Sequence, residues 1–172
     1  QDPSGATGPG ENGFVAWGDY DGDGDLDLAV NGFGLAASYR FQVYRNDGGA
    51  SPFVLAQEPS GNPGPGGGLT WGDYDNDGDL DLAVNGIDDT TYRFRVYRND
   101  GGASPFVLAQ EPAGATGPGN GAVTWGDYDN DGDLDLAVNG YDGVGYRFRV
   151  YRNDGGTFNL AQEPAGASGP AD

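Results

Sequence analysis

One acidic segment recurs three times and limits what this chain can fold into. Residues 71–86 read WGDYDNDGDLDLAVNG, residues 125–140 repeat this letter for letter, and residues 17–32 differ only by a glycine in place of the asparagine. Each copy places five aspartates within nine positions. Because carboxylates this close together repel one another, a folded structure needs a cation among them. The chain is therefore expected to contain three copies of one cation-binding structural unit.

The repeat has a constant period. Equivalent tryptophans, Trp17, Trp71 and Trp125, are 54 residues apart, which is near the length of propeller blades rather than that of helical solenoids. A second segment, RNDGGASPFVLAQEP, occupies residues 45–59 and 98–112 and returns in shortened form at residues 152–164. Whatever these segments do is therefore done three times.

Each copy contains four short stretches with the character of β-strands. In the first copy these are residues 13–17, 26–31, 39–45 and 53–57. The strict alternation in the second stretch is typical of a half-buried strand, and no segment has the period of a helix. Asn-Asp-Gly-Gly before the last stretch tolerates positive φ and predicts a turn. Four antiparallel strands per repeat predict one propeller-type blade, with the aspartate loop between its first two strands.

We therefore predict an all-β fold of three tandem four-stranded antiparallel blades. The expected divisions are a Gly/Pro-rich segment at 1–12, blade 1 at 13–58, linker and blade 2 at 59–112, linker and blade 3 at 113–164, and a terminal segment at 165–172. Linkers rich in glycine and proline cannot hold a regular ladder, so we expect them to be crossings between blades. Because the sequence starts at Gln1 without methionine, we expect a processed form or a fragment. The same kind of segment opens and closes the chain, as expected for a slice of a longer array.

The aspartate loop suits calcium. Calcium takes about six to eight oxygen ligands, and side chains at alternating positions of a tight loop can converge on one point. In the first copy Asp19, Asp21 and Asp23 hold the alternating positions, Asp25 would offer its backbone carbonyl, and Asp27 would close the shell. We expect three calcium ions, one per repeat. The candidate ligands are Asp19, Asp21, Asp23, Asp25, Asp27, Asp73, Asp75, Asp77, Asp79, Asp81, Asp127, Asp129, Asp131, Asp133 and Asp135.

Other metal sites fit the sequence less well. An EF-hand needs glutamate at the twelfth loop position, which is Val30, Val84 or Val138 here. Magnesium prefers few carboxylates and keeps its waters, while zinc and iron favour histidine or cysteine, and the chain has neither.

The motif D-x-D-x-D-G-D-x-D, followed by L-A-V-N-G and later by Y-R-N-D-G-G, resembles the calcium-binding blades of the FG-GAP and VCBS repeat family. That family is similar to the propeller head of integrin alpha subunits. The resemblance covers nearly the whole chain and is closer to the VCBS-like branch, because the literal Phe-Gly and Gly-Ala-Pro words are not in place. It implies side-chain ligation from the first, third, fifth and ninth loop positions and carbonyl ligation from the seventh.

Composition narrows the classes of partner. The formal charge is -19, and the eight basic residues are all arginine, so nucleic acid and anionic membrane surfaces are poor partners. No apolar run is long enough for membrane insertion. We expect no enzyme, because the chain lacks histidine, cysteine and lysine and no catalytic constellation occurs just once. A glycosidase would need one carboxyl group with a raised pKa, whereas calcium keeps its ligands ionised.

Three further features allow two interpretations each. The recurrent tryptophans could stack on sugars, but packing in the core is favoured. The arginines at 40, 93, 95, 147 and 149 could bind an anion, but pairing with aspartates across neighbouring strands is favoured. The loops at residues 33–38, 87–91 and 141–145 differ between copies; they could bind a ligand or simply drift as surface loops do.

Two functions stay open. The first is a structural subunit whose exposed blade edges and Gly/Pro-rich ends associate head to tail into a filament or ring. The second is an adhesion or carbohydrate-binding module of a larger protein, with the variable loops recognising a glycan or a cell-surface protein. Matching repeats and matching ends favour the first. Extracellular modules bind calcium at about 10⁻⁴ to 10⁻³ M, so we expect an extracellular or cell-surface location.

Overall fold

The structure is a computed structural model that describes residues 11–34, 38–50, 52–59, 67–88, 90–113 and 117–164. Every regular element in these residues is a β-strand, as the sequence predicted. Within the same residues, no helix is present that could cross a membrane. The two expectations for the chain ends, at 1–12 and 165–172, fall largely outside the described residues.

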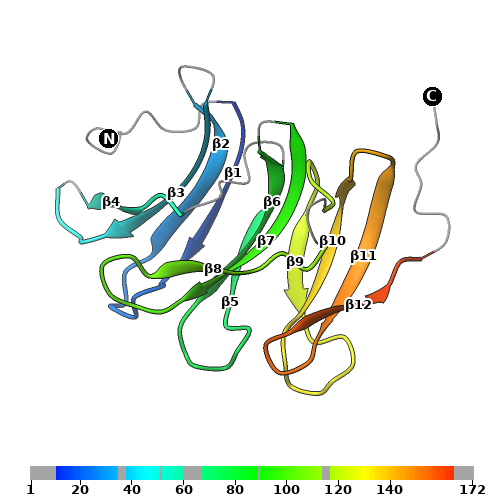
Figure 1. The fold of residues 1–172 in the computed structure, drawn as a ribbon. Coiled ribbons are helices and arrows are strands. Elements are labelled where there is room, and N and C mark those ends of the chain that lie inside the picture. Colours follow the sequence, from blue (N-terminus) through cyan, green and yellow to red (C-terminus); the bar gives the residue numbers. More distant parts are fainter. Residues whose placement is uncertain are drawn as a thin grey trace.

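Twelve strands form three four-stranded antiparallel sheets, each built in chain order. Sheet 1 contains β1 (Glu11–Gly18), β2 (Asp27–Gly34), β3 (Ser38–Asn46) and β4 (Phe53–Gln57). Sheet 2 contains β5 (Leu69–Gly72), β6 (Asp81–Asp88), β7 (Thr91–Asn99) and β8 (Phe106–Gln110). Sheet 3 contains β9 (Val123–Gly126), β10 (Asp135–Tyr141), β11 (Tyr146–Asn153) and β12 (Phe158–Gln162). The sheets lie side by side in chain order as an open row, and the described strands do not close into a ring (Figure 1).

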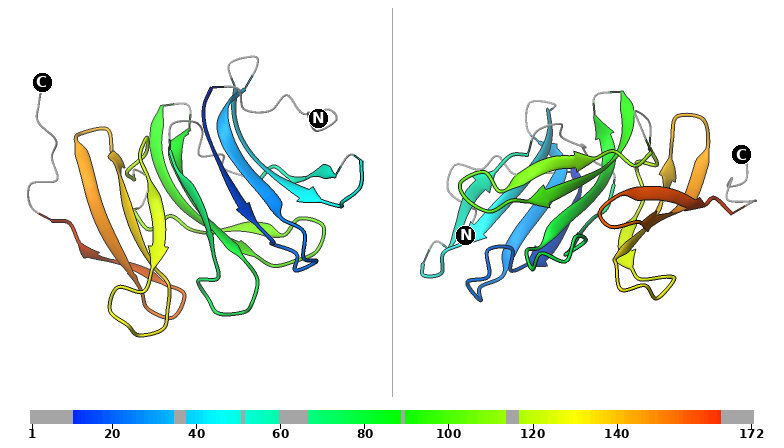
Figure 2. Two further views of the ribbon diagram at one scale, coloured as in Figure 1. Left: turned by 180° about the vertical axis from the view of Figure 1, so that it is seen from behind. Right: turned by 60° about the horizontal axis from the view of Figure 1, so that its bottom comes forward.

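The strands begin and bend where the local sequence allows it. β1 begins earlier than residue 13, because Glu11 still pairs with Phe33 across an irregularity before Phe14. The pairing of β3 with β4 shifts register between Val43 and Tyr44, and the same shift recurs in the other two sheets. Such bulges bend a strand and increase its twist. β4, β8 and β12 accordingly swing away from the other strands of their sheets (Figure 2).

The cores lie between the sheets rather than within any one of them. One buried cluster joins sheets 1 and 2, with Phe41 and Val43 packed near Leu82 and Tyr97. A second cluster joins sheets 2 and 3. The alternation in the second strand predicted burial on one face only, and this is wrong for β6, where residues 81–86 are all buried. The reason is that sheet 2 has a neighbour on both faces.

Tryptophan marks each junction between sheets. The ring of Trp71 lies parallel to that of Tyr20 in sheet 1, with centroids 6.1 Å apart and planes inclined by 4°. Its Nε1 donates to the carbonyl of Ala16 at 3.1 Å. Glycine makes room for the ring, because a Cβ on Gly18 would lie 2.8 Å from it. Trp125 repeats this arrangement on sheet 2, so packing is the correct interpretation for these two tryptophans.

Just before β5 and β9, the glycines of the linkers lie very close to the backbone of the second strand of the same sheet, β6 or β10. A Cβ on Gly121 would lie 2.1 Å from the carbonyl oxygen of Asn139, and one on Gly67 would lie 2.0 Å from that of Asn85. These two linker positions therefore need glycine, because any side chain would collide with the neighbouring backbone.

This close approach yields a test. We expect Gly121→Ala to lower the free energy of unfolding by about 1–3 kcal/mol, because the added methyl group forces the two backbones apart. The matched control is Gly145→Ala, where an added Cβ meets no atom within 4 Å. Thermal or urea unfolding in calcium measures both, and equal stability of the two variants would contradict the packing described here.

Candidate metal centre

Three acidic loops connect the first two strands of the sheets, and we name them loop 1 (residues 19–27), loop 2 (73–81) and loop 3 (127–135). In loop 1 the structure brings one carboxylate oxygen from each of Asp19, Asp21 and Asp27 within 4.8 Å of the other two. The corresponding triads are Asp73, Asp75 and Asp81 in loop 2, and Asp127, Asp129 and Asp135 in loop 3. The first, third and ninth predicted positions therefore converge in every repeat.

The ninth aspartate is fixed by hydrogen bonds to the backbone. Asp27 has no exposed surface, and its Oδ2 accepts the N–H of Tyr20 at 3.0 Å while its Oδ1 accepts the N–H of Asn46 at 2.8 Å. Asp81 and Asp135 make the same pair of bonds in sheets 2 and 3. One side chain thus ties the loop, the start of the second strand and the end of the third strand together.

In loop 1 the first aspartate presents an oxygen that no residue in the described part of the chain satisfies. Oδ2 of Asp19 accepts the N–H of Gly24 at 3.0 Å, whereas its Oδ1 is buried without a hydrogen-bond partner. Oδ1 of Asp75 in loop 2 is buried and unpartnered in the same way. Leaving an ionised oxygen in this state costs free energy, and a cation among the three carboxylates would remove that cost. The donor set contains only oxygens, which fits a hard divalent cation.

The fifth and seventh predicted positions lie outside these triads. Asp23 is exposed, and its Oδ1 accepts the N–H of Asp25 at 2.8 Å. Asp77 and Asp131 accept the equivalent N–H groups of Asp79 and Asp133. Ligation by the fifth side chain and by the seventh carbonyl therefore stays a prediction.

Neighbouring loops 2 and 3 are linked directly. The side-chain amide of Asn76 donates to Oδ1 of Asp133 at 2.9 Å. Asn76 has a φ of 60°, a left-handed conformation that asparagine and glycine tolerate best, which explains why Gly22 can replace it in loop 1. Because glycine has no side chain, loop 1 cannot make the same link to loop 2.

Burial changes the titration of the triads. Removal from water raises the pKa of Asp81 to about 7, although the N–H groups of Asn99 and Tyr74 favour the charged form. Burial also raises the pKa of Asp27, its main cause again being the loss of hydration. Burial raises the pKa of Asp75 too, and the nearby charge of Asp77 acts in the same direction. Each of these shifts means that the ionised triad is costly without a compensating positive charge.

Sequence reasoning missed the asparagine at the end of the third strand. Asn99 was assigned only to a turn, yet its N–H holds Asp81 and its side-chain amide donates to the carbonyl of Tyr20 in sheet 1 at 3.0 Å. Asn153 makes the same bond to Tyr74 at 2.7 Å. The signal that could have identified it is its presence at the same place in all three copies. Loops 2 and 3 are therefore each tied to the preceding sheet.

The candidate anion-binding arginines are paired with acids. Arg93 and Arg95 both lie against Asp88 and Glu111, and the closest contact is 2.7 Å from Nε of Arg95 to Glu111. Arg147 and Arg149 repeat this arrangement with Asp142 and Glu163, and Arg40 contacts Glu58. Pairing across strands is confirmed, with glutamates as partners in addition to the predicted aspartates.

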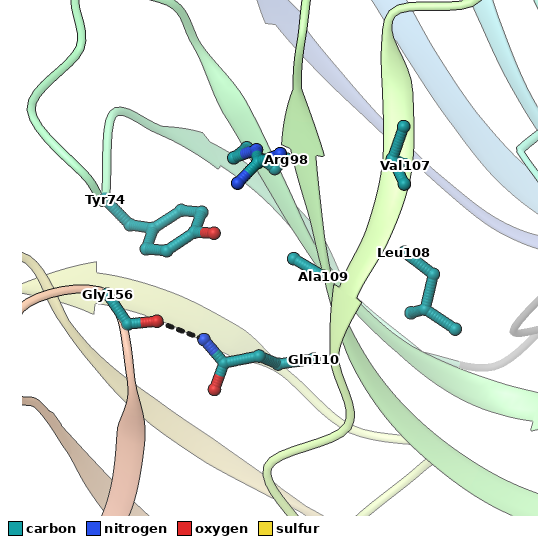
Figure 3. A pocket seen from close by; sticks show the side chains of 7 residues that line it. All are labelled: Tyr74, Arg98, Val107, Leu108, Ala109, Gln110 and Gly156. Carbon is teal, nitrogen blue, oxygen red and sulfur yellow. Dashed lines mark hydrogen bonds between the residues drawn. The ribbon is translucent and has the colours of Figure 1, made fainter.

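A cavity of about 230 Å³ lies at the junction of sheets 2 and 3 (Figure 3). It is lined by Tyr74, Arg98, Val107, Leu108, Ala109, Gln110 and Gly156. The side chain of Gln110 crosses this junction to the carbonyl of Gly156, and its Oε1 accepts the N–H of Phe158 at 3.1 Å. Gln57 bridges sheets 1 and 2 in the same way, so the cavity belongs to a recurring contact between sheets.

The ninth aspartate gives the clearest substitution test. We expect Asp81→Asn to weaken calcium binding at loop 2 by at least about tenfold, because the number of charged ligands sets calcium affinity. Asp100→Asn is the matched control, since Asp100 pairs with Arg98 on the surface and lies outside the triad. Calorimetric titration should show one site weakened in the first variant and all sites retained in the second. Equal binding by both would contradict the assignment of Asp81.

The pKa of Asp81 predicts how the calcium-free protein responds to pH. The pKa of Asp81 in the folded form is raised to about 7, whereas the ordinary pKa of an aspartate is 3.8. The folded state therefore binds more protons across this window, and its free energy of unfolding falls as pH rises through it. We expect the gain in melting temperature on adding calcium to be small near pH 4 and to grow towards pH 7. Asp81→Asn should reduce that growth, and a gain independent of pH in both proteins would refute the explanation.

Comparison with known families agrees with the repeat organisation. A family model described as FG-GAP-like repeat matches residues 32–84 and again residues 86–138. The first match contains loop 2 and the second contains loop 3, so each spans the end of one sheet and the acidic loop of the next. A search of curated proteins found no match. Because the two matches cover more than half of the residues, this chain belongs to the FG-GAP-like repeat family.

Proposed function

We propose that each of the three loops binds one calcium ion and that the ions stabilise the sheets and the contacts between them. The chain then acts as an extracellular, non-catalytic structural repeat protein that associates with itself into a filament or ring. The observation that supports the metal site most strongly is the buried, unpartnered Oδ1 of Asp19 beside Asp21 and Asp27, together with the buried, unpartnered Oδ1 of Asp75, the third-position aspartate of the triad in loop 2.

Calcium is favoured among the possible ions by the chemistry of the donors. Each triad consists of three carboxylates, and the chain offers neither histidine nor cysteine. Calcium accepts many carboxylate oxygens in irregular geometry, whereas magnesium demands a small octahedron and keeps several waters. Membership of the FG-GAP-like family supports the same ion and an extracellular location.

A structural role follows from what the triads are attached to. Asp81 is bound to the backbone of Asn99, and the side chain of Asn99 reaches the backbone of Tyr20 in the preceding sheet. An ion that neutralises Asp81 therefore stabilises a contact between two sheets as well as its own loop. Without the ion, the three carboxylates of each triad, one of which is buried, repel one another.

Calcium removal tests the proposed function. We expect three calcium ions per chain by calorimetric titration, and filaments or rings by electron microscopy in millimolar calcium. EDTA should lower the melting temperature and disperse the assemblies, and added magnesium should restore neither. Dispersed single chains in calcium that bind glycans would instead favour an adhesion module, and a melting temperature unchanged by EDTA would rule out the metal assignment.

A further inference from the structure

In the two outer sheets, residues equivalent to those that pack one sheet on the next inside the chain are exposed. On sheet 1, Val15 is 62% exposed and Trp17 is 55% exposed. The equivalent of Val15 in sheet 2 is Leu69, which is buried against sheet 1, and the equivalent of Trp17 is Trp71, which packs there. Sheet 1 therefore presents the face that sheets 2 and 3 use to pack on their predecessors.

Sheet 3 presents the opposite face at the other end of the row. Tyr128 is 47% exposed and Phe148 is 40% exposed. Their equivalents in sheet 2, Tyr74 and Phe94, are buried against sheet 3. Gly126 has open space beside it, whereas the equivalent Gly18 and Gly72 each lie against the tryptophan of the following sheet. The open space beside Gly126 and Tyr128, which we call the seat, can therefore receive a tryptophan ring.

Directional hydrogen bonds accompany both internal junctions. The tryptophan Nε1 donates to a carbonyl of the preceding first strand, the asparagine at the end of the third strand donates to the tyrosine carbonyl of the preceding loop, and a glutamine of the preceding fourth strand bridges to the backbone of the next sheet. These bonds are made by Trp71, Asn99 and Gln57 at the first junction, and by Trp125, Asn153 and Gln110 at the second. The junctions are therefore repeated in geometry as well as in composition.

The outer faces of sheets 1 and 3 carry the same hydrogen-bonding groups that form these junction bonds inside the chain. Within the described part of the chain, the exposed side chain of Gln162 makes no bond of this kind, although it is equivalent to Gln57 and Gln110. At the other end, among the residues that the structure describes, the side chain of Asn46 bonds only within its own sheet and turn. Each end of the molecule therefore holds one half of the internal junction.

We propose that sheet 3 of one copy packs against sheet 1 of a second copy by repeating this junction. Trp17 of the second copy lies over Gly126 and Tyr128 of the first, and its Asn46 donates to the carbonyl of Tyr128. Gln162 of the first copy bridges to the backbone of the second at Phe53. The inference rests on the proposed self-association and specifies its partner and its two surfaces. Contact between two different faces is heterologous, so it continues into a filament or closes into a ring.

Two variants that each block one face test the proposal. Trp17→Ala removes the side chain that fills the seat, and Gly126→Leu fills the seat, where an added Cβ meets no atom within 4 Å in the single chain. In millimolar calcium we expect each variant alone to self-associate at least about tenfold more weakly, as loss of a central tryptophan contact does. Mixed in equal amounts, the variants should form a dimer and nothing larger, because one keeps sheet 3 intact and the other keeps sheet 1 intact. Sedimentation velocity measures all three samples.

Controls separate the junction from the fold and from the proposed function. Val54→Ala should assemble as the unmodified chain does, because the equivalent Val107 stays 48% exposed in sheet 2, which has neighbours on both faces. Both blocking variants should keep the circular dichroism spectrum and three calcium ions per chain. Assembly of the unmodified chain with no dimer in the mixture overturns the junction but leaves the proposed function standing. A dimer in the mixture that persists in EDTA supports the junction and contradicts the calcium requirement, while an unmodified chain that stays single overturns both.

Discussion

The rest of the structure depends on a buried carboxylate at the start of the second strand of each sheet. Asp27, Asp81 and Asp135 are almost fully buried, and each accepts backbone N–H groups from its own loop and from the end of the third strand. The hydrogen bonds fix the position of each carboxylate, but burial still raises the pKa of Asp27 and of Asp81 and so disfavours their charged forms. In the folded state, a positive charge at this place in each repeat would therefore be stabilising. The other two aspartates of the triad strengthen this effect, because they add negative charge nearby.

Stacking of the sheets answers a second constraint, which is the small size of each one. Four short strands have two faces to cover, and a single sheet of this kind has no core of its own. Tryptophan over glycine and tyrosine, with polar bonds on either side, lets one sheet serve as the cover for the next. The repeated unit is therefore incomplete by itself, as in other linear repeat proteins, where stability comes largely from contacts between neighbours.

Much of this organisation could be predicted from the sequence because the repeats display it three times. The four strands, their antiparallel order and the convergence of the first, third and ninth aspartates follow from alternation and spacing. Burial of β6 on both faces could not be predicted, because Leu82 and Ala83 read locally as inside and outside positions, and only the stacking buries both. The reach of Asn99 to Tyr20 joins residues 79 positions apart, a separation on which local patterns have no bearing. The close approach of Gly121 to the backbone could not be predicted for the same reason, since its neighbour Asn139 lies in another strand.

The open space beside Gly126 also bears on how a chain of this kind can gain repeat units. Each unit bears a tryptophan on one face and the matching glycine and tyrosine on the other, so copying a whole unit copies both halves of the contact. A gene that gains or loses one unit then yields a longer or shorter row whose new neighbours already fit. Selection can adjust the length of the row in single steps, without having to invent a surface each time.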